Sequence, residues 1–366
     1  MTRLEDSLTS GHISILSKVE NKFENYVYNF KFKNFILNNG LYVGILVLLI
    51  FTIIYYAATY GQFLLGSAQI FDILENVSPK IFFALGVACI IVLGGTDLSI
   101  GSLVGMGAIF TVMLCTTDGH TDLTMFGNAL NFSAIPLGVR VPLAFILSIS
   151  SCVAFSALAG YFTAKFKMHP FISTLSTQLI VIGIISIVTN NSRTGYPDAG
   201  LRQALTGRIG DFPIMIFFAI IAIAVMWFIW NKTKFGKNLY AVGGNGEAAT
   251  VSGISVFKTT LLAFVLAGIY YGIGSSLYGI YSGSTYGTMA AGMEADAIAA
   301  CVVGGVSFSG GVGKISGVVI GAILFQAITY ILVLLGVTDA NAQFVIKGVI
   351  ILAAVALDCA KYLKKK

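Results

Sequence analysis

The chain has 366 residues, of which 57% are hydrophobic and only 10% are charged, and its mean hydropathy is +0.88. Soluble domains carry about 25% charged residues, so this composition excludes a water-soluble protein and predicts a helical membrane protein. The net charge of +6 does not indicate nucleic-acid binding, because the basic residues sort between the two sides of the predicted spans.

Apolar runs long enough to cross a bilayer, which takes about 20 residues, recur along the chain. We expect regular spans at Leu41–Tyr60, Val141–Phe162, Phe171–Val188, Phe212–Trp230, Thr259–Ile280 and Ile315–Leu335. We expect shorter or glycine-interrupted segments at Ile81–Leu93, Leu98–Cys115, Ala297–Val306 and Phe344–Leu357. The predicted fold is an all-α, polytopic membrane helix bundle of about ten segments over residues 41–360, with a charged extension (1–40) and a basic tail (361–366).

The lysines and arginines predict the orientation of these spans. With the N-terminus inside, the outer segments hold five basic residues, Lys80, Arg140, Arg193, Arg202 and Arg208, against sixteen on the inner side. An excess of Lys and Arg is typical of cytoplasmic loops. We therefore expect a multi-pass membrane protein with both termini cytoplasmic. The mixed charges of residues 1–40 do not resemble a cleaved signal peptide.

Two glycine-containing breaks resemble each other at a distance of about 210 residues. One is Gly94-Gly95-Thr96-Asp97-Leu98-Ser99, and the other is Gly304-Gly305-Val306-Ser307-Phe308-Ser309. Paired interrupted segments in two halves of a chain point to a transport pathway, although glycines also permit close helix packing. The pseudo-repeat gives the candidate pathway residues Gly94, Gly95, Asp97, Ser99, Gly304, Gly305, Ser307 and Ser309.

Asp97 lies between two apolar segments, where a carboxylate is costly unless it is capped, paired or hydrated. One interpretation places it at a gate of the pathway. The other makes it the N-cap of a helix that begins near Leu98, with help from Ser99.

The sequence holds no recognisable energy-converting or catalytic motif. A P-loop would read GxxxxGK[ST], and the nearest stretch, Gly313-Lys314-Ile315, lacks both the Ser/Thr and the first Gly. The three histidines, His12, His120 and His169, are scattered. We expect no catalytic residue, no metal site and no cofactor bound by this chain.

The polar connection 231–258 is expected on the cytoplasmic side. Within it, Glu247–Val251 is predicted as a short helix with Asn245 as its cap and Gly253 as its stop. Such a helix is either a lever for a soluble partner or an ordinary loop helix.

The stretch from Gly243 to Ile254 resembles the coupling loop of permease subunits of bacterial ABC importers, through its Gly-Gly-Asn-x-Glu-Ala-Ala-x-x-Ser-Gly-Ile pattern. Four further segments resemble the ribose/galactose branch of these permeases: Gly94–Gly101, Pro170–Leu175, Trp230–Asn238 and Ala295–Gly313. The resemblance runs from about residue 41 to the C-terminus and is strongest to galactose/methyl-galactoside permeases. Gly246 departs from the pattern, where Pro is expected.

The resemblance implies a complete import machine in a bacterial cytoplasmic (inner) membrane. Two permease copies, a homodimer, would form the pathway, an ABC ATPase subunit would bind ATP–Mg, and an extracytoplasmic sugar-binding protein would deliver a monosaccharide. The residues that it assigns to ATPase coupling are Gly244, Asn245, Glu247, Ala248, Ala249 and Gly253. It adds Pro170, Phe171 and Thr174 to the pathway.

Galactose, methyl galactoside or glucose is the expected substrate, and ribose or a nucleoside remains an alternative. A different class, a self-sufficient ion-coupled secondary transporter, would need ionisable groups within the membrane. Only Asp97 and Asp296 are candidates for that role.

Overall fold

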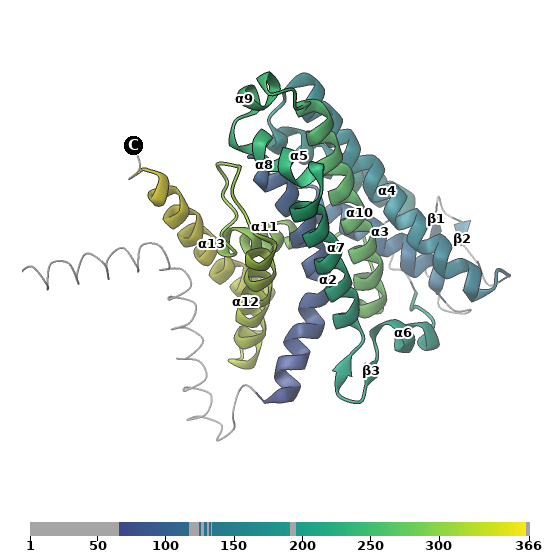
Figure 1. Cartoon of the computed structure of the whole chain (residues 1–366). Helices are drawn as coiled ribbons and strands as arrows, with labels where there is room; N and C mark the ends of the chain where they lie inside the picture. The colour runs from purple at the N-terminus through teal and green to yellow at the C-terminus, as the bar shows by residue number, and fades with distance from the viewer. Residues whose placement is uncertain are drawn as a thin grey trace, which may run out of the picture. The chain divides into compact units, whose positions relative to one another are not determined.

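The computed structural model describes residues 66–116, 124–125, 128–129, 132, 134–190 and 195–363. The described residues from 66 to 351 belong to one compact unit, and those from Leu352 onward belong to another. The helices are α2 (Ser67–Val92), α3 (Ile100–Cys115), α4 (Leu137–Phe166), α5 (Pro170–Thr189), α6 (Ala199–Thr206), α7 (Met215–Lys232), α8 (Lys234–Gly244), α9 (Gly246–Val251), α10 (Val256–Ser282), α11 (Met293–Val303), α12 (Ile315–Leu334) and α13 (Ala340–Leu363) (Figure 1).

Two short antiparallel hairpins complete the described chain. Strand β1 (Thr124–Met125) pairs with β2 (Asn128–Ala129), and β3 (Arg208–Ile209) pairs with β4 (Phe212–Pro213). The second hairpin leads directly into α7, and α7 leads into α8 and α9. The β3–β4 hairpin and the α8–α9 pair therefore lie at opposite ends of the bundle (Figure 1).

Six described helices, α2, α4, α5, α7, α10 and α12, are long and apolar enough to cross a membrane. The predicted regular spans correspond to α4, α5, α7, α10 and α12, except for Leu41–Tyr60, which lies outside the described residues. The shorter predicted segments correspond to α3, α11, α13 and the second half of α2.

The prediction for α2 was wrong in its length. The helix has 26 residues and begins at Ser67 instead of Ile81, because its first half carries Asp72, Glu75 and Lys80, which interrupt the apolar run. These side chains are held by partners from other elements, as described below. Lys80 lies near the middle of this helix, so it does not belong to an outer segment between spans.

Helix α10 lies at the centre of the bundle and packs against α4, α2 and α3. Close approach to α4 depends on two glycines: a Cβ at Gly268 would lie 2.7 Å from the Cα of Val153, and one at Gly272 would overlap the backbone of Ile149. The hydroxyl of Ser156 donates to the carbonyl oxygen of Phe264 at 2.7 Å. Small residues and interhelical hydrogen bonds of this kind hold helices together in lipid.

Helices α4, α5 and α7 expose large apolar side chains to their surroundings. Ile146, Leu179, Ile187 and Phe228 are among them, each more than half exposed. Such a continuous apolar outer face suits a lipid solvent and would be unstable in water.

Candidate functional site

The short helix α9 forms an exposed tip after α8. Asn245 caps it, with Oδ1 accepting from the backbone N–H of Ala248 at 2.9 Å. The helix ends at Val251, and Gly253, two residues later, has a φ of 80° in the left-handed region. The N–H of Ile254 bonds to the carbonyl of Ala249 at 2.9 Å. The predicted cap and stop are both confirmed, because Gly reaches this φ without a Cβ penalty.

Most of α9 faces outward. Ala249 is buried, but Glu247 and Ala248 are exposed, and Val251 is 91% exposed. An apolar side chain left in the open at the tip of a polar loop is suited to contact with another protein.

Helix α8 connects α9 to the membrane helices through aromatic contacts. The Tyr240 hydroxyl donates to the carbonyl oxygen of Gly313 at 2.8 Å. The Tyr240 ring meets the Trp230 ring edge-on, with centroids 5.7 Å apart. The indole N–H of Trp230 in turn contacts Sγ of Cys89 in α2 at 3.3 Å.

Four glycines bring the end of α8 against two helix breaks. We call Gly94, Gly243, Gly310 and Gly311 the glycine junction. A Cβ at Gly243 would overlap the carbonyl oxygen of Val92, and one at Gly310 would overlap that of Gly243. The N–H of Gly311 donates to the carbonyl of Val92 at 2.8 Å. The ends of α2 and α8 and the loop after α11 therefore meet backbone to backbone, immediately before the Asn245 cap of α9.

The two breaks after α2 and α11 end in the same local geometry. Gly94 and Gly305 have φ of 82° and 81°. The N–H of Gly94 bonds to Ile91 and that of Gly305 to Val302, and the following residues bond back to Ile90 and Cys301, all at 2.8–3.0 Å. This is the Schellman pattern in both cases. The two sequence stretches place Gly94 opposite Gly304. In the structure, the residue whose backbone conformation matches that of Gly94 is Gly305.

Gly304 packs closely against another helix instead of supplying the left-handed turn. A Cβ at Gly304 would overlap the carbonyl oxygen of Gly317 in α12, and one at Gly321 would overlap that of Ala300. Close helix packing therefore explains these glycines. The nearby Ser307 is buried and accepts from the N–H of Ser309 at 3.2 Å, which shapes the loop that reaches the glycine junction.

Asp97 is fully buried at the first break. Its Oδ1 accepts from the backbone N–H of Ser99 at 2.8 Å and from its hydroxyl at 2.6 Å. Its Oδ2 accepts from the Tyr271 hydroxyl of α10 at 3.1 Å. Helix α3 begins at Ile100, so Ser99 holds the N-cap position, and Asp97 orders the turn before it and attaches it to α10.

The start of α5 closes over the same break. A Cβ at Gly95 would lie 2.7 Å from the ring of Pro170, and Thr174 Oγ1 accepts from the N–H of Leu98 at 3.1 Å. Phe171, in contrast, is 45% exposed. The structure thus brings Pro170 and Thr174 to the Asp97 turn, whereas Phe171 remains largely exposed.

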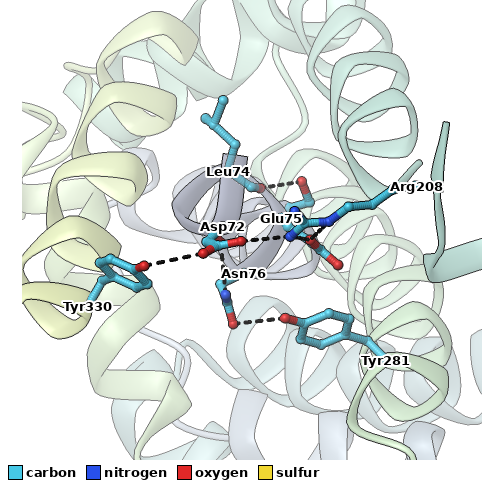
Figure 2. Close-up of polar contacts among 8 residues, drawn as sticks. Asp72, Leu74, Glu75, Asn76, Arg208, Tyr281 and Tyr330 are labelled. Carbon is cyan, nitrogen blue, oxygen red and sulfur yellow. Dashed lines mark hydrogen bonds and ion pairs between the residues drawn. The ribbon is translucent and has the colours of Figure 1, made fainter. Parts of the chain in front are cut away.

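A polar network at the β3–β4 end was not predicted from the sequence (Figure 2). The Arg208 guanidinium pairs with Asp72, at 2.7 Å, and with Glu75. Tyr330 of α12 donates to Asp72 at 3.2 Å, and Tyr281 of α10 donates to Asn76 at 3.1 Å. The hydrogen bonds that Arg208 donates to Asp72 and Glu75 raise its pKa above the usual value, so the guanidinium stays charged. The signal for this site was the acidic pair in an otherwise apolar helix.

Comparison with known proteins assigns the chain to a family. Residues 69–354 match the family described as "Branched-chain amino acid transport system / permease component". The chain belongs to this permease family. Six apolar helices together with this family make the permease a multi-pass membrane protein.

Its relatives carry the names of sugar importers. The permease is 45% identical over 370 residues to the galactose/methyl galactoside import permease protein of Treponema pallidum, covering 98% of this chain and 69% of that one. It is 40% identical over 345 residues to the protein of the same name from Escherichia coli, covering 92% and 98%. It is 31% identical over 321 residues to the ribose import permease protein of Bacillus subtilis, covering 87% and 92%. No solved structure matches the chain.

Proposed function

We propose that this permease forms the translocation pathway for a monosaccharide in an ATP-driven importer, with galactose or a methyl galactoside as substrate. The observation that carries the proposal is the exposed helix α9, attached through the glycine junction to both helix breaks. Relatives named for galactose and methyl galactoside import support the choice of substrate.

In this proposal a separate ABC ATPase subunit binds ATP–Mg and supplies the energy, and the permease itself hydrolyses no ATP. The docking element for that subunit is α9, with Glu247, Ala248 and the exposed Val251 on its surface. Movement of α9 passes through α8 to the ends of α2 and α11, and the pathway alternates between outward-facing and inward-facing states.

The charge distribution supports a cytoplasmic α8–α9 end. Lys232 ends α7, and Lys234 and Lys237 lie near the start of α8. The end of α4 that carries Lys165 lies beside the start of α10, where Tyr161 meets Phe257. Basic residues are typical of cytoplasmic loops. We propose about ten membrane segments, both termini cytoplasmic, and the 231–258 loop on the cytoplasmic side.

Two permease copies would enclose the pathway, and an extracytoplasmic sugar-binding protein would dock at the opposite end, near β3–β4 and α6. The two Schellman breaks support a repeat of the same device in two halves of the chain. The break after α2 lies beside the end of α8, and the loop after α11 contacts the same point. A movement transmitted from α9 would open or close a path there.

The competing class is an ion-coupled carrier that works alone. Asp97 is fully buried and accepts three hydrogen bonds, and Asp296 is paired with Lys347 at 2.9 Å. These fixed partners favour a structural role for both carboxylates over a proton or sodium relay.

Uptake by proteoliposomes tests the proposal. Vesicles would hold the permease with and without its ATPase and sugar-binding protein, and they would be offered labelled galactose, glucose, ribose and leucine. Galactose uptake that requires all three proteins and ATP is the expected result. Uptake by the permease alone, driven by an ion gradient, would overturn the proposal. Uptake of leucine instead of sugars would overturn the substrate assignment.

A further inference from the structure

The connection between α10 and α11, residues 283–292, is a non-helical stretch that lies within the bundle. We call it the turn segment. Gly283 and Gly292 at its two ends have φ of 82° and 89°, in the left-handed region that favours glycine. Inside it, the N–H groups of Met289 and Ala291 bond to carbonyls three residues earlier, both at 3.1 Å. The segment is therefore a series of turns and not a continuation of either helix.

The turn segment runs along α3 in the opposite direction, backbone against backbone. A Cβ at Gly105 would lie 2.8 Å from the carbonyl oxygen of Gly287, and one at Gly101 would lie 2.7 Å from that of Ala290. Later residues of the segment thus meet earlier residues of the helix. These two glycines allow the segment to pack directly on α3.

The end of α3 indicates how deep the turn segment goes. The carbonyl oxygen of Cys115, the last residue of α3, accepts from the N–H of Asp198 at 2.9 Å, immediately before α6. Gly105 and Gly101 lie about 15 Å and about 21 Å along the helix from Cys115 at 1.5 Å per residue. The hydrocarbon core of a bilayer is about 30 Å thick. The segment therefore carries irregular backbone from the α6 end of the bundle far into the membrane.

Buried and exposed residues alternate along the turn segment. Thr285 and Ala290 are fully buried, whereas Tyr286 is 42% exposed. Thr288 and Ala291 are exposed as well. One edge of the segment packs inside the bundle, and the other edge, formed by Tyr286, Thr288 and Ala291, faces out of the chain.

Lipid does not suit this exposed edge. Irregular backbone at membrane depth occurs only where protein covers it or where it lines a water-filled cavity. The neighbouring α5 presents the opposite kind of surface, because Leu179 and Ile187 are more than half exposed on a regular apolar helix. The turn segment and the exposed face of α5 therefore belong to different environments.

Glu294, two residues after the turn segment, also favours water at this place. A Cβ at Gly101 would overlap Oε2 of Glu294, so the carboxylate lies at the deep end of the segment. It accepts from the N–H of Gly292 at 3.2 Å, and the ion pairs among the described residues do not include it. Ionisable groups at membrane depth face the bundle interior or a water-filled cavity.

We propose that the exposed edge of the turn segment lines the translocation pathway from the α6 end to the middle of the membrane, and that the second copy of the chain closes the pathway on the opposite side. This inference rests on the proposed function, in which two copies enclose the path. Each copy contributes one wall. The hydroxyl groups of Tyr286 and Thr288 both donate and accept hydrogen bonds, so the wall is polar and uncharged and keeps water in the path.

Labelling of single cysteines tests the proposal. The complete complex would be reconstituted in vesicles, and a water-soluble maleimide that does not enter lipid would be supplied on both sides of the bilayer. The cysteines within the described residues are buried, and Cys359→Ser removes the remaining one. We expect Thr288→Cys and Ala291→Cys to react about tenfold faster than Leu179→Cys, the control on α5, because the reactive thiolate forms in water and not in lipid.

A lipid-soluble maleimide separates the other possibilities. Labelling would be measured with and without ATP, and reaction with the water-soluble reagent in either condition supports the proposal. Reaction of Thr288→Cys and Ala291→Cys with the lipid-soluble reagent alone would place the edge in lipid. Reaction with neither reagent would place it in a dry contact between the two copies. Each of these two results would overturn the proposal.

Import gives a separate measurement. Thr288→Trp would place a bulky ring in the path, and we expect galactose uptake about tenfold lower, since the width of a path limits what passes it. ATP hydrolysis and thermal melting in detergent should stay near those of wild type. Leu179→Trp is the matched control and should import normally. Equal uptake by the two folded variants would contradict the proposal. Failure of the wild-type complex to import any sugar, with the cysteines labelled as expected, would instead overturn the proposed function alone.

Discussion

The two ends of the bundle are built by different physical means. At the α8–α9 end, α2, α8 and the loop after α11 meet through the backbone of the glycine junction. At the β3–β4 end, α2 is joined to the hairpin and to α12 by the side chains of Arg208, Asp72 and Tyr330 (Figure 2). A backbone contact has one geometry and does not depend on salt. A half-exposed ion pair is adjustable and is screened by salt.

This difference suits the proposed roles of the two ends. A stiff joint transmits a push from α9 without absorbing it, because close-packed backbone has no rotamers to change. An exposed ion network can open and re-form when another protein approaches.

The largest effect is expected from Gly243→Ala. The added Cβ would overlap the carbonyl oxygen of Val92, and neither backbone can move aside freely, so we expect a loss of stability of about 1–3 kcal/mol and ATP hydrolysis that no longer drives uptake. The control is Gly183→Ala in α5, where an added Cβ meets nothing within 4 Å. Similar uptake by the two variants would show that the junction transmits nothing.

Asp97→Asn removes a charge from the stiff end. The carboxylate accepts from Ser99 twice and from Tyr271 once, and an amide cannot accept at both of its ends. We expect about 1–3 kcal/mol lower stability in detergent and a larger fall in the rate of uptake. Unchanged uptake would reduce Asp97 to a residue that orders the turn before α3.

Arg208→Gln tests the adjustable end. The guanidinium is 39% exposed, but Glu75 is only 10% exposed and would lose its cationic partner, so we expect a loss of stability of about 1 kcal/mol. We expect uptake to become less sensitive to salt between low and high ionic strength, because the wild-type ion pairs are screened and the variant has none to lose. A salt dependence identical to that of wild type would contradict the assignment of an electrostatic joint.

Gly246→Pro should have the smallest effect and a stabilising one. Gly246 is the first residue of α9, its added Cβ would meet nothing within 4 Å, and Asn245 before it is extended at φ −161° and ψ 103°. Proline fits such a position, and we expect about 0.4–1 kcal/mol of added stability from the lower entropy of the unfolded chain. Slower hydrogen exchange of the α9 backbone amides in the variant would confirm this stabilisation, and faster exchange would contradict it.

The sequence predicted those parts of the fold that depend on local chemistry. The Asn245 cap, the Gly253 stop and most of the apolar helices follow from residue type and spacing, because their partners lie within a few positions along the chain. The same reasoning failed for α2, since Asp72, Glu75 and Lys80 bond to Arg208, Tyr330 and Gln326, which are far away in sequence.

The candidate site was predictable only in part for the same reason. Glycine-rich breaks are visible in the sequence, but that Gly243 meets Val92 and Gly310 is a fact of tertiary packing. The assignment of Gly94 to Gly304 was wrong by one residue, because the sequence pattern aligns glycine pairs, whereas the structure aligns left-handed turns. The contacts of Asp72 with Tyr330 and of Lys80 with Gln326 were not predicted, because each of these residues looks like an isolated polar interruption in the sequence.

The central claim is that an ATPase acting on α9 drives sugar through this permease. The most direct measurement records ATP hydrolysis and labelled galactose uptake together in vesicles that contain the permease, its ATPase and its sugar-binding protein. The account predicts uptake that rises with hydrolysis, stops with a non-hydrolysable ATP analogue, and disappears in Gly243→Ala but not in Gly183→Ala. Uptake that continues without ATP, powered by a sodium or proton gradient, would contradict it.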